Sequence, residues 1–155
     1  MSRGLGDVYK RQNLHNPNIP LKAQEVTFRL IYNMTPTRDR ELNISRQLAK
    51  CQLCRTNIQE TEEHIFFECS TIRQTKETLH KMIETHTNKK TDIYRAIMLN
   101  TLPKTTVDIH SKLLILLAEY RHLIWACRNA ATFHTKIYNE SLFNQIFLWK
   151  AAIIT

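Results

Sequence analysis

Glycine is almost missing from this chain, and its absence restricts the backbone more than any other feature of the sequence. Both glycines, Gly4 and Gly6, lie within the first twelve residues, and the rest of the 155-residue chain contains none. Only four prolines are present, so Asn and Thr provide most of the interruptions between apolar segments. Within those segments the apolar residues recur at helical spacing, which predicts an all-α fold.

The helical spacing divides the chain into a series of amphipathic segments. Helices are expected over residues 21–34, 38–49, 71–86, 107–133, from Thr91 or Asp92 to Leu102, and from Asn139 onward. The longest of them is the candidate hydrophobic spine, with an inward face formed by Leu113, Leu117, Tyr120, Ile124 and Cys127. In the last helix the residues that repeat at helical spacing are Leu142, Ile146, Trp149 and Ile153.

The composition is that of a globular protein, with 43% hydrophobic and 23% charged residues. The most apolar stretch, residues 113–127, is interrupted by Glu119, Arg121 and His122, which predicts a soluble protein without a membrane partner. The N-terminus lacks the order of basic, apolar and small residues that marks a secretory signal. We therefore expect an intracellular protein, in the nucleus or the cytoplasm, whose thiols are reduced or metal-bound.

Three of the four cysteines and one histidine fall in a short segment with the pattern Cys51-x2-Cys54-x9-His64-x4-Cys69. Two cysteines separated by two residues can direct both sulfurs to one point across a tight turn, which supplies half of a tetrahedral zinc shell. Thr61, followed by two glutamates, is a helix start signal that places His64 in the first turn of a short helix. The pattern predicts a zinc knuckle over 51–69, embedded in a small helical bundle, and a short hairpin at 50–58 would fit its first turn.

The spacing of the second ligand pair sets a geometric condition. His64 and Cys69 are five residues apart, and in a regular α-helix they would point about 140° away from each other. The helix must therefore tighten or end before Cys69. Glu60 or a backbone carbonyl is a candidate to hold the second nitrogen of the His64 ring.

Other interpretations of the cysteines carry less weight. Cysteines can be small buried hydrophobic residues, but that interpretation does not account for a histidine and a third cysteine at zinc-like spacing behind a helix start. A closed shell of four protein ligands leaves no position for water, which argues against catalytic zinc. Redox chemistry at Cys51 and Cys54 would require a thioredoxin-like βαβ pattern, which the sequence lacks.

The first residues of the chain have a separate origin. Residues 2–12, SRGLGDVYKRQ, resemble the translation of a transposase mosaic-end adapter used in sequencing libraries. We therefore expect residues 1–12 to be adapter-derived and non-native, with the native chain starting near Asn13 and its true beginning missing. That segment carries three basic residues and one acidic residue, so the net charge of +8 falls to +6 without it. This balance is compatible with a nucleic-acid partner but does not require one.

The segments around the four ligands carry a resemblance to a known family. VTFRLIYNMTPTRDRELNI (26–44), CQLC and ETEEHIFFECSTIRQ (60–74) resemble the zinc-binding segment at the carboxy end of non-LTR (LINE-type) retrotransposon reverse transcriptases. Farther on, residues 113–134 resemble the "IW-x-x-RN" helix that often follows this segment in the family. The sequence departs from the family at Arg55, where a glycine is usual, and Asn57 is the nearest residue that tolerates a left-handed turn.

The resemblance implies a function without catalysis. It implies a noncatalytic zinc-binding module that assists RNA template or target DNA binding in target-primed reverse transcription, with RNA favoured over DNA and the upstream reverse transcriptase domain as a second partner. The alternative is a structural, zinc-stapled helical domain for protein–protein docking. The chain carries no polymerase or nuclease motif, so we expect a fragment of a polyprotein whose RNA-directed DNA polymerase lies elsewhere.

Site residues follow from the pattern and the resemblance. The expected zinc ligands are Cys51, Cys54, His64 and Cys69. Candidate nucleic-acid contacts, each of which could also be an ordinary surface charge, are Arg38, Arg40, Arg46, Lys50, Arg55, Arg73 and Lys76. Trp125 is expected to pack in the core, and Arg128 to anchor a helix contact or an internal salt bridge. Residues 13–86 should hold helices and the knuckle, and residues 87–155 a helical bundle continuous with them in one domain.

Overall fold

The computed structural model describes residues 16–37 and 49–154, and in these residues the fold is all-α, as predicted. The elements in chain order are α2 (Leu21–Ile31), the π-helix η1 (His64–Glu68), the 3-10 helix η2 (Ser70–Ile72), α4 (Arg73–Thr87), α5 (Ile93–Leu99), α6 (Val107–Phe133) and α7 (Glu140–Ile154). Between the described residues the one β feature is an isolated antiparallel bridge from Lys50 to Gln59. The helix expected over 38–49 lies outside the described residues, apart from its last position.

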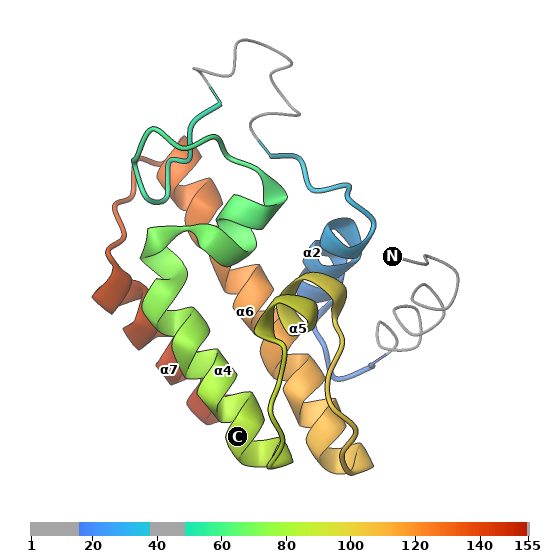
Figure 1. Ribbon diagram of the computed structural model, residues 1–155. Coiled ribbons are helices and arrows are strands. Elements are labelled where there is room, and N and C mark those ends of the chain that lie inside the picture. Colours follow the sequence, from blue (N-terminus) through green and yellow to red (C-terminus); the bar gives the residue numbers. More distant parts are fainter. Residues whose placement is uncertain (1–15, 38–48, 155) are drawn as a thin grey trace.

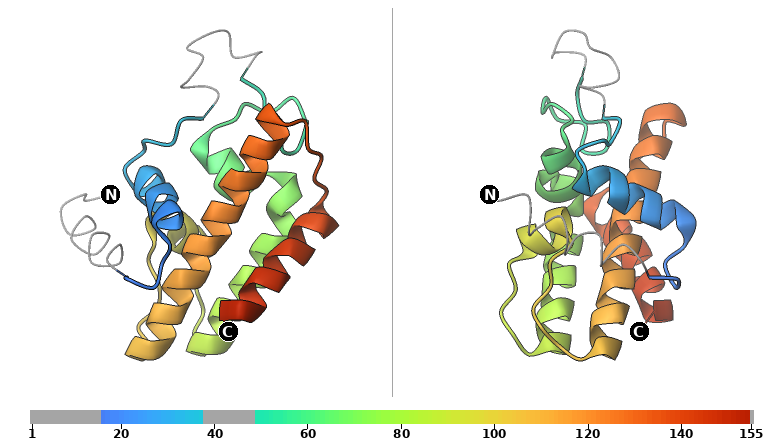
Figure 2. Two further views of the ribbon diagram at one scale, coloured as in Figure 1. Left: turned by 180° about the vertical axis from the view of Figure 1, so that it is seen from behind. Right: turned by 90° about the vertical axis from the view of Figure 1, so that its right-hand side faces the viewer.

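Helix α6 runs through the centre of the bundle (Figure 1). Helices α2 and α5 lie on one side of it, and α4 and α7 lie together on the other (Figure 2). The segment that carries the cysteines sits at the C-terminal end of α6, above the start of α4 (Figure 1). No helix in the described part of the chain combines the length and the apolar character needed to cross a membrane.

The core is built around the predicted spine. All five residues of its expected inward face are buried, at 4% exposure or less: Leu113, Leu117, Tyr120, Ile124 and Cys127. One continuous cluster of buried side chains joins them to α2, the cysteine segment, α4, α5 and α7. The cysteine segment therefore shares its hydrophobic core with the helices that follow it.

Asparagine replaces glycine where the chain must turn. Asn33, Asn88 and Asn100 all adopt left-handed backbone conformations with φ between 53° and 56°, just after α2, α4 and α5. Asparagine tolerates this region better than other non-glycine residues, so a chain without glycine can still end its helices there. The helix that was expected to run to Leu102 therefore ends at Leu99, with Asn100 as its C-cap.

Side-chain caps mark the starts of α5, α6 and α7. The Asp92 carboxylate accepts a hydrogen bond from the Arg95 N–H, and the Asn139 side chain accepts one from the Leu142 N–H, as expected. The spine spans Val107–Phe133, as expected. Its cap is Thr106, whose hydroxyl accepts from the Ile109 N–H at 3.4 Å.

Helix α7 packs through a face that the sequence pattern did not indicate. Trp149 is 69% exposed and Ile153 is 73% exposed, whereas Phe143, Phe147 and Ala151 are buried. The ring of Phe147 meets the ring of Tyr120 edge-on at 5.7 Å. The helix is apolar around most of its circumference, so spacing alone does not identify the face that packs.

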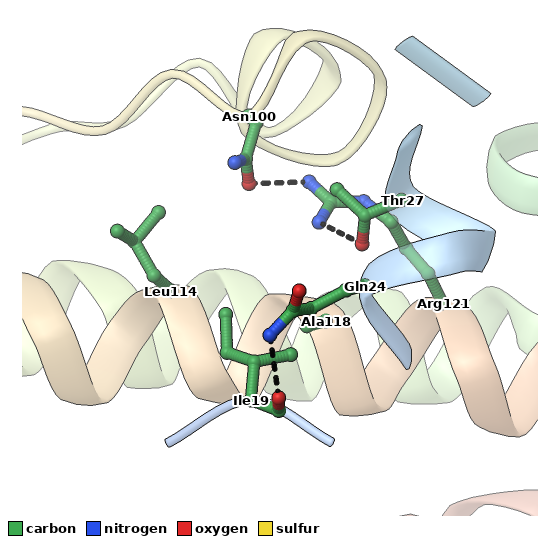
Figure 3. Close-up of a pocket in the computed structure, with 7 residues that line it drawn as sticks. All are labelled: Ile19, Gln24, Thr27, Asn100, Leu114, Ala118 and Arg121. Atoms are coloured by element: carbon green, nitrogen blue, oxygen red, sulfur yellow. Dashed lines mark hydrogen bonds between the residues drawn. The ribbon is translucent and has the colours of Figure 1, made fainter. Parts of the chain in front are cut away.

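A buried arginine joins α2, α5 and α6 beside a small cavity (Figure 3). The guanidinium of Arg121 donates to the carbonyls of Ala96 and Ile97 at 2.8 Å and to the Asn100 side chain at 2.9 Å. It also donates to the Thr27 hydroxyl at 3.3 Å. Burial lowers the pKa of Arg121 to about 9, so the guanidinium stays charged at neutral pH. The carbonyl groups at the C-terminal end of α5 stabilise this positive charge.

Candidate metal centre

A short hairpin presents the first two cysteines. Around the Lys50–Gln59 bridge, the Cys51 N–H donates to the Ile58 carbonyl at 2.9 Å and the Glu60 N–H donates to the Ala49 carbonyl at 2.7 Å. These bonds correspond to the hairpin expected at 50–58. The two cysteines lie at the start of its turn, which closes with a hydrogen bond from the Arg55 N–H to the Cys51 carbonyl at 3.2 Å.

Arg55 takes the strained position in that turn. Its φ is 57°, whereas Asn57, the residue expected to accommodate a left-handed turn, is not among the positive-φ residues. The turn needs this conformation directly after the second cysteine, where the resembling family usually has glycine. The position is fixed by the need to bring both sulfurs to one side, and Arg55 therefore carries the steric cost that glycine would avoid.

A π-helix presents the other two ligands. The Thr61 hydroxyl accepts a hydrogen bond from the His64 N–H at 3.1 Å, which confirms the predicted helix start. The chain then widens over η1, and the Cys69 N–H donates to the His64 carbonyl at 2.7 Å. Because an i→i+5 bond closes one wide turn, it returns Cys69 to the face of His64. The helix ends before Cys69, as expected, but it widens instead of tightening.

The four side chains meet at one point. One ligand atom from each of Cys51, Cys54, His64 and Cys69 lies within 4.8 Å of all the others. The Cys54 Sγ and His64 Nε2 atoms are 3.4 Å apart. In a tetrahedral zinc site with usual bond lengths, sulfur and nitrogen ligands are about 3.6 Å apart and two sulfurs about 3.8 Å apart. The four ligand atoms therefore lie within about 1 Å of the separations that a zinc ion requires.

The donor set and its surroundings favour zinc. Three thiolates and one imidazole are soft ligands of the kind that structural zinc sites use. Cys51, His64 and Cys69 are buried and Cys54 is partly exposed, so a bound ion would be shielded by the protein. Four protein ligands complete a closed tetrahedral shell, which is the arrangement of a structural site.

The pKa values of two of the ligands are shifted by their neighbours in the cluster. The hydrogen bond with Cys69 and burial raise the pKa of the Cys51 thiol far above its ordinary value. Burial lowers the pKa of His64, but the contacts with the Cys51 and Cys54 sulfurs outweigh it and raise the pKa to about 9. Without a metal, the cluster therefore favours a protonated Cys51 thiol and a protonated His64 ring. A divalent ion can replace those protons, and zinc binding releases them.

Glu60 has a different contact from the one expected. Its carboxylate, which is fully buried, accepts three hydrogen bonds from the guanidinium of Arg128 at 2.7 to 3.1 Å. Trp125 is buried, and its ring stacks with that of Phe66 at 6.3 Å and lies 4.5 Å from the Arg128 guanidinium carbon. The predicted core role of Trp125 and the internal salt bridge of Arg128 are both present. No local signal in the sequence identified Glu60 as the partner, because the pair is 68 residues apart.

The candidate nucleic-acid residues are in different environments. Arg55 and Arg73 are exposed, and Lys50 is half-buried beside the bridge. The Lys76 ammonium donates to the Phe67 carbonyl at 2.7 Å and lies 4.0 Å from the centre of its ring, and burial lowers its pKa. The remaining candidates, Arg38, Arg40 and Arg46, lie outside the described residues. Lys76 thus has an internal packing role that the sequence did not reveal.

Comparison with known proteins relates the first half of the chain to a protein family. Residues 2–75 match the family model described as zinc-binding in reverse transcriptase. The match includes the adapter-like residues 2–12, whose origin stays a prediction. No curated protein and no solved structure matches the chain. The matched family is an accessory zinc-binding segment and not a catalytic domain, and the cluster of three cysteines and one histidine lies inside it. Residues 2–75 are therefore similar to the zinc-binding segments of reverse transcriptases.

Proposed function

We propose that the chain is the noncatalytic C-terminal zinc-binding module of a non-LTR retrotransposon reverse transcriptase. In this role it assists the binding of template RNA, or of target DNA, in target-primed reverse transcription inside the cell. The family match to zinc-binding segments of reverse transcriptases carries this proposal. The role of zinc is structural, because the ion fixes the hairpin to the π-helix and the charged side chains around them then keep a defined geometry.

Exposed arginines next to the ligands support nucleic-acid binding. Arg55 follows Cys54 directly, and Arg73 begins α4, four residues after Cys69. Guanidinium groups form paired hydrogen bonds with phosphates, and neutralising phosphates releases counterions from the nucleic acid. Arg55 lies on the segment that holds the ligands, and Arg73 follows that segment at the start of α4. Zinc binding would therefore fix the backbone positions from which both guanidinium groups extend.

The test is the salt dependence of RNA binding by the zinc-loaded chain, followed by fluorescence anisotropy. For a single strand, each phosphate contact changes the slope of log K against log salt concentration by about 0.7. We expect the double variant Arg55→Gly/Arg73→Gln to bind more weakly and to lose about 1.4 of slope. Glycine at the first position removes the charge and relieves the left-handed backbone, so the variant should keep its zinc.

A matched control changes the same number of charges elsewhere. Lys89 and Lys90 follow the other end of α4, which is about 22 Å long, and both are exposed. The variant Lys89→Gln/Lys90→Gln should keep the slope and the affinity of the unmodified chain. Equal losses in the two double variants would show that binding is only the attraction of a basic protein for RNA, which would contradict the proposal.

The alternative function is docking onto the polymerase part of the same polyprotein. The uncovered face of α7 favours it, because Leu148, Trp149 and Ile153 are 44%, 69% and 73% exposed on neighbouring turns. Zinc would then stabilise the fold without any contact to nucleic acid. Weaker association of a Trp149→Ser/Ile153→Ser variant with the reverse transcriptase domain, with RNA binding unchanged or absent, would favour this alternative.

A further inference from the structure

Side chains beyond the family match contact the segment that carries the zinc ligands. The family match ends at residue 75, whereas two large buried side chains that contact the segment, Trp125 and Arg128, come from α6. They approach it near the C-terminal end of the helix, where the hairpin and the π-helix lie against α6 (Figure 1). The metal site is therefore continuous with the bundle.

Glu60 occupies the junction between the two pairs of ligands. On one side of it, the hairpin bonds to Ala49 and Ile58 hold the backbone of Cys51. On the other side, Thr61 caps the helix through the His64 N–H, and its carbonyl accepts from the Ile65 N–H at 3.0 Å. A displacement of residue 60 would move one ligand pair relative to the other. Whatever fixes Glu60 therefore fixes the position of one ligand pair relative to the other.

Arg128 fixes Glu60 through a buried ion pair. The guanidinium Nε is 3.1 Å from both carboxylate oxygens and Nη2 is 2.7 Å from Oε1, and both side chains are 1% exposed or less. The guanidinium is in turn fixed by a hydrogen bond to the Asn129 side chain at 2.9 Å and by the Trp125 ring. A buried charge that loses its partner is strongly unfavourable, so this contact is not readily exchanged for another.

We infer that Arg128 is a positioning residue of the zinc site, which sets the distance between the hairpin ligands and the helix ligands through Glu60. It supplies no ligand atom itself. Groups that hydrogen-bond directly to metal ligands typically change metal affinity 10- to 100-fold when they are removed, and Arg128 acts one residue farther from the ion, so we expect an effect at the lower end of this range. Because metal affinity and conformation are linked, zinc should in turn hold the C-terminal end of α6 against the segment. This inference depends on zinc binding and not on the nucleic-acid role.

The experiment measures zinc affinity by competition with a chromophoric chelator in the full chain. We expect Arg128→Met to weaken zinc binding by about 10-fold. Arg128→Lys should be intermediate, because an ammonium keeps the charge but cannot form the paired hydrogen bonds. The visible spectrum of the cobalt-substituted protein should change with Arg128→Met, since it reports the geometry of the ligands and not the stability of the fold.

Arg121 provides a matched control. It is an arginine on the same helix, equally buried, and its hydrogen bonds go to α2, α5 and Asn100 instead of the zinc segment. Arg121→Met should lower the stability of the bundle while leaving zinc affinity and the cobalt spectrum unchanged. If both methionine variants weaken zinc binding equally, the effect is general destabilisation and the inference is overturned.

Two further variants keep the test decisive if Arg128→Met does not fold. Glu60→Gln keeps the shape of the side chain but removes its charge, and we expect it to weaken zinc binding in the same way. The double variant Glu60→Gln/Arg128→Met removes both buried charges and should recover stability without recovering zinc affinity. Full recovery of affinity in the double variant would refute a positioning role.

Discussion

Replacing Phe147 with alanine should destabilise the protein by about 3–5 kcal/mol, the usual cost of removing a buried phenylalanine. The side chain is 1% exposed and lies edge-on to Tyr120 at 5.7 Å, in a cluster that joins α7 to α6. The loss combines the transfer of the ring, the cavity left behind and the aromatic contact, which by itself contributes about 0.5–1.5 kcal/mol. In a domain of this size the melting temperature should fall by on the order of 10 °C.

The assay is urea unfolding of the zinc-loaded protein, with Trp149→Ala as the comparison. Trp149 lies two residues away on the same helix and is 69% exposed, so its replacement should change the free energy of unfolding by less than about 0.5 kcal/mol. The midpoint should move with an unchanged m value, because the surface exposed on unfolding is almost the same. A larger loss from Trp149→Ala than from Phe147→Ala would refute the assignment of the packed face.

Two more predictions concern the metal and the helix ends. Zinc affinity should rise with pH and zinc binding should release protons, because the pKa of Cys51 is raised and that of His64 is about 9 in the metal-free cluster. Titration calorimetry in buffers of different ionisation enthalpy measures the number of protons released. Zinc binding without proton release would contradict the prediction. Asn88→Gly should leave stability unchanged or raise it slightly, whereas Asn88→Ala should cost about 1 kcal/mol, because residue 88 has a φ of 53°. Thermal unfolding compares the two variants, and equal melting temperatures would show that the left-handed cap does not matter.

The predicted zinc ligands illustrate what a local pattern can reveal. The hairpin, the Thr61 cap and the end of the helix before Cys69 all depend on residues within a few positions of one another. The pattern could not show that the helix widens. An α-helix and a π-helix place the same residues in different directions, and the choice depends on closing the metal cluster and packing Ile65 and Phe66 into the core.

Long-range contacts explain what the sequence did not reveal. Glu60 was a candidate to orient His64, and its contact with Arg128 only forms when α6 folds back over the hairpin. Lys76 stays a candidate for phosphate contact, and its hydrogen bond to the Phe67 carbonyl was not predicted. In each case the partner of a charged side chain is set by how the elements pack, and the residues next to it in the sequence do not reveal that partner.

The sequence by itself determined the all-α class, the position of the spine and the identity of the metal cluster. These properties follow from backbone restriction, helical periodicity and the spacing of donor atoms, which act over one or two turns. Only the tertiary structure decided which face of α7 packs and how the zinc segment is joined to α6. Those outcomes depend on how whole helices meet, because burial of apolar area and pairing of buried charges are settled between surfaces that are far apart along the chain.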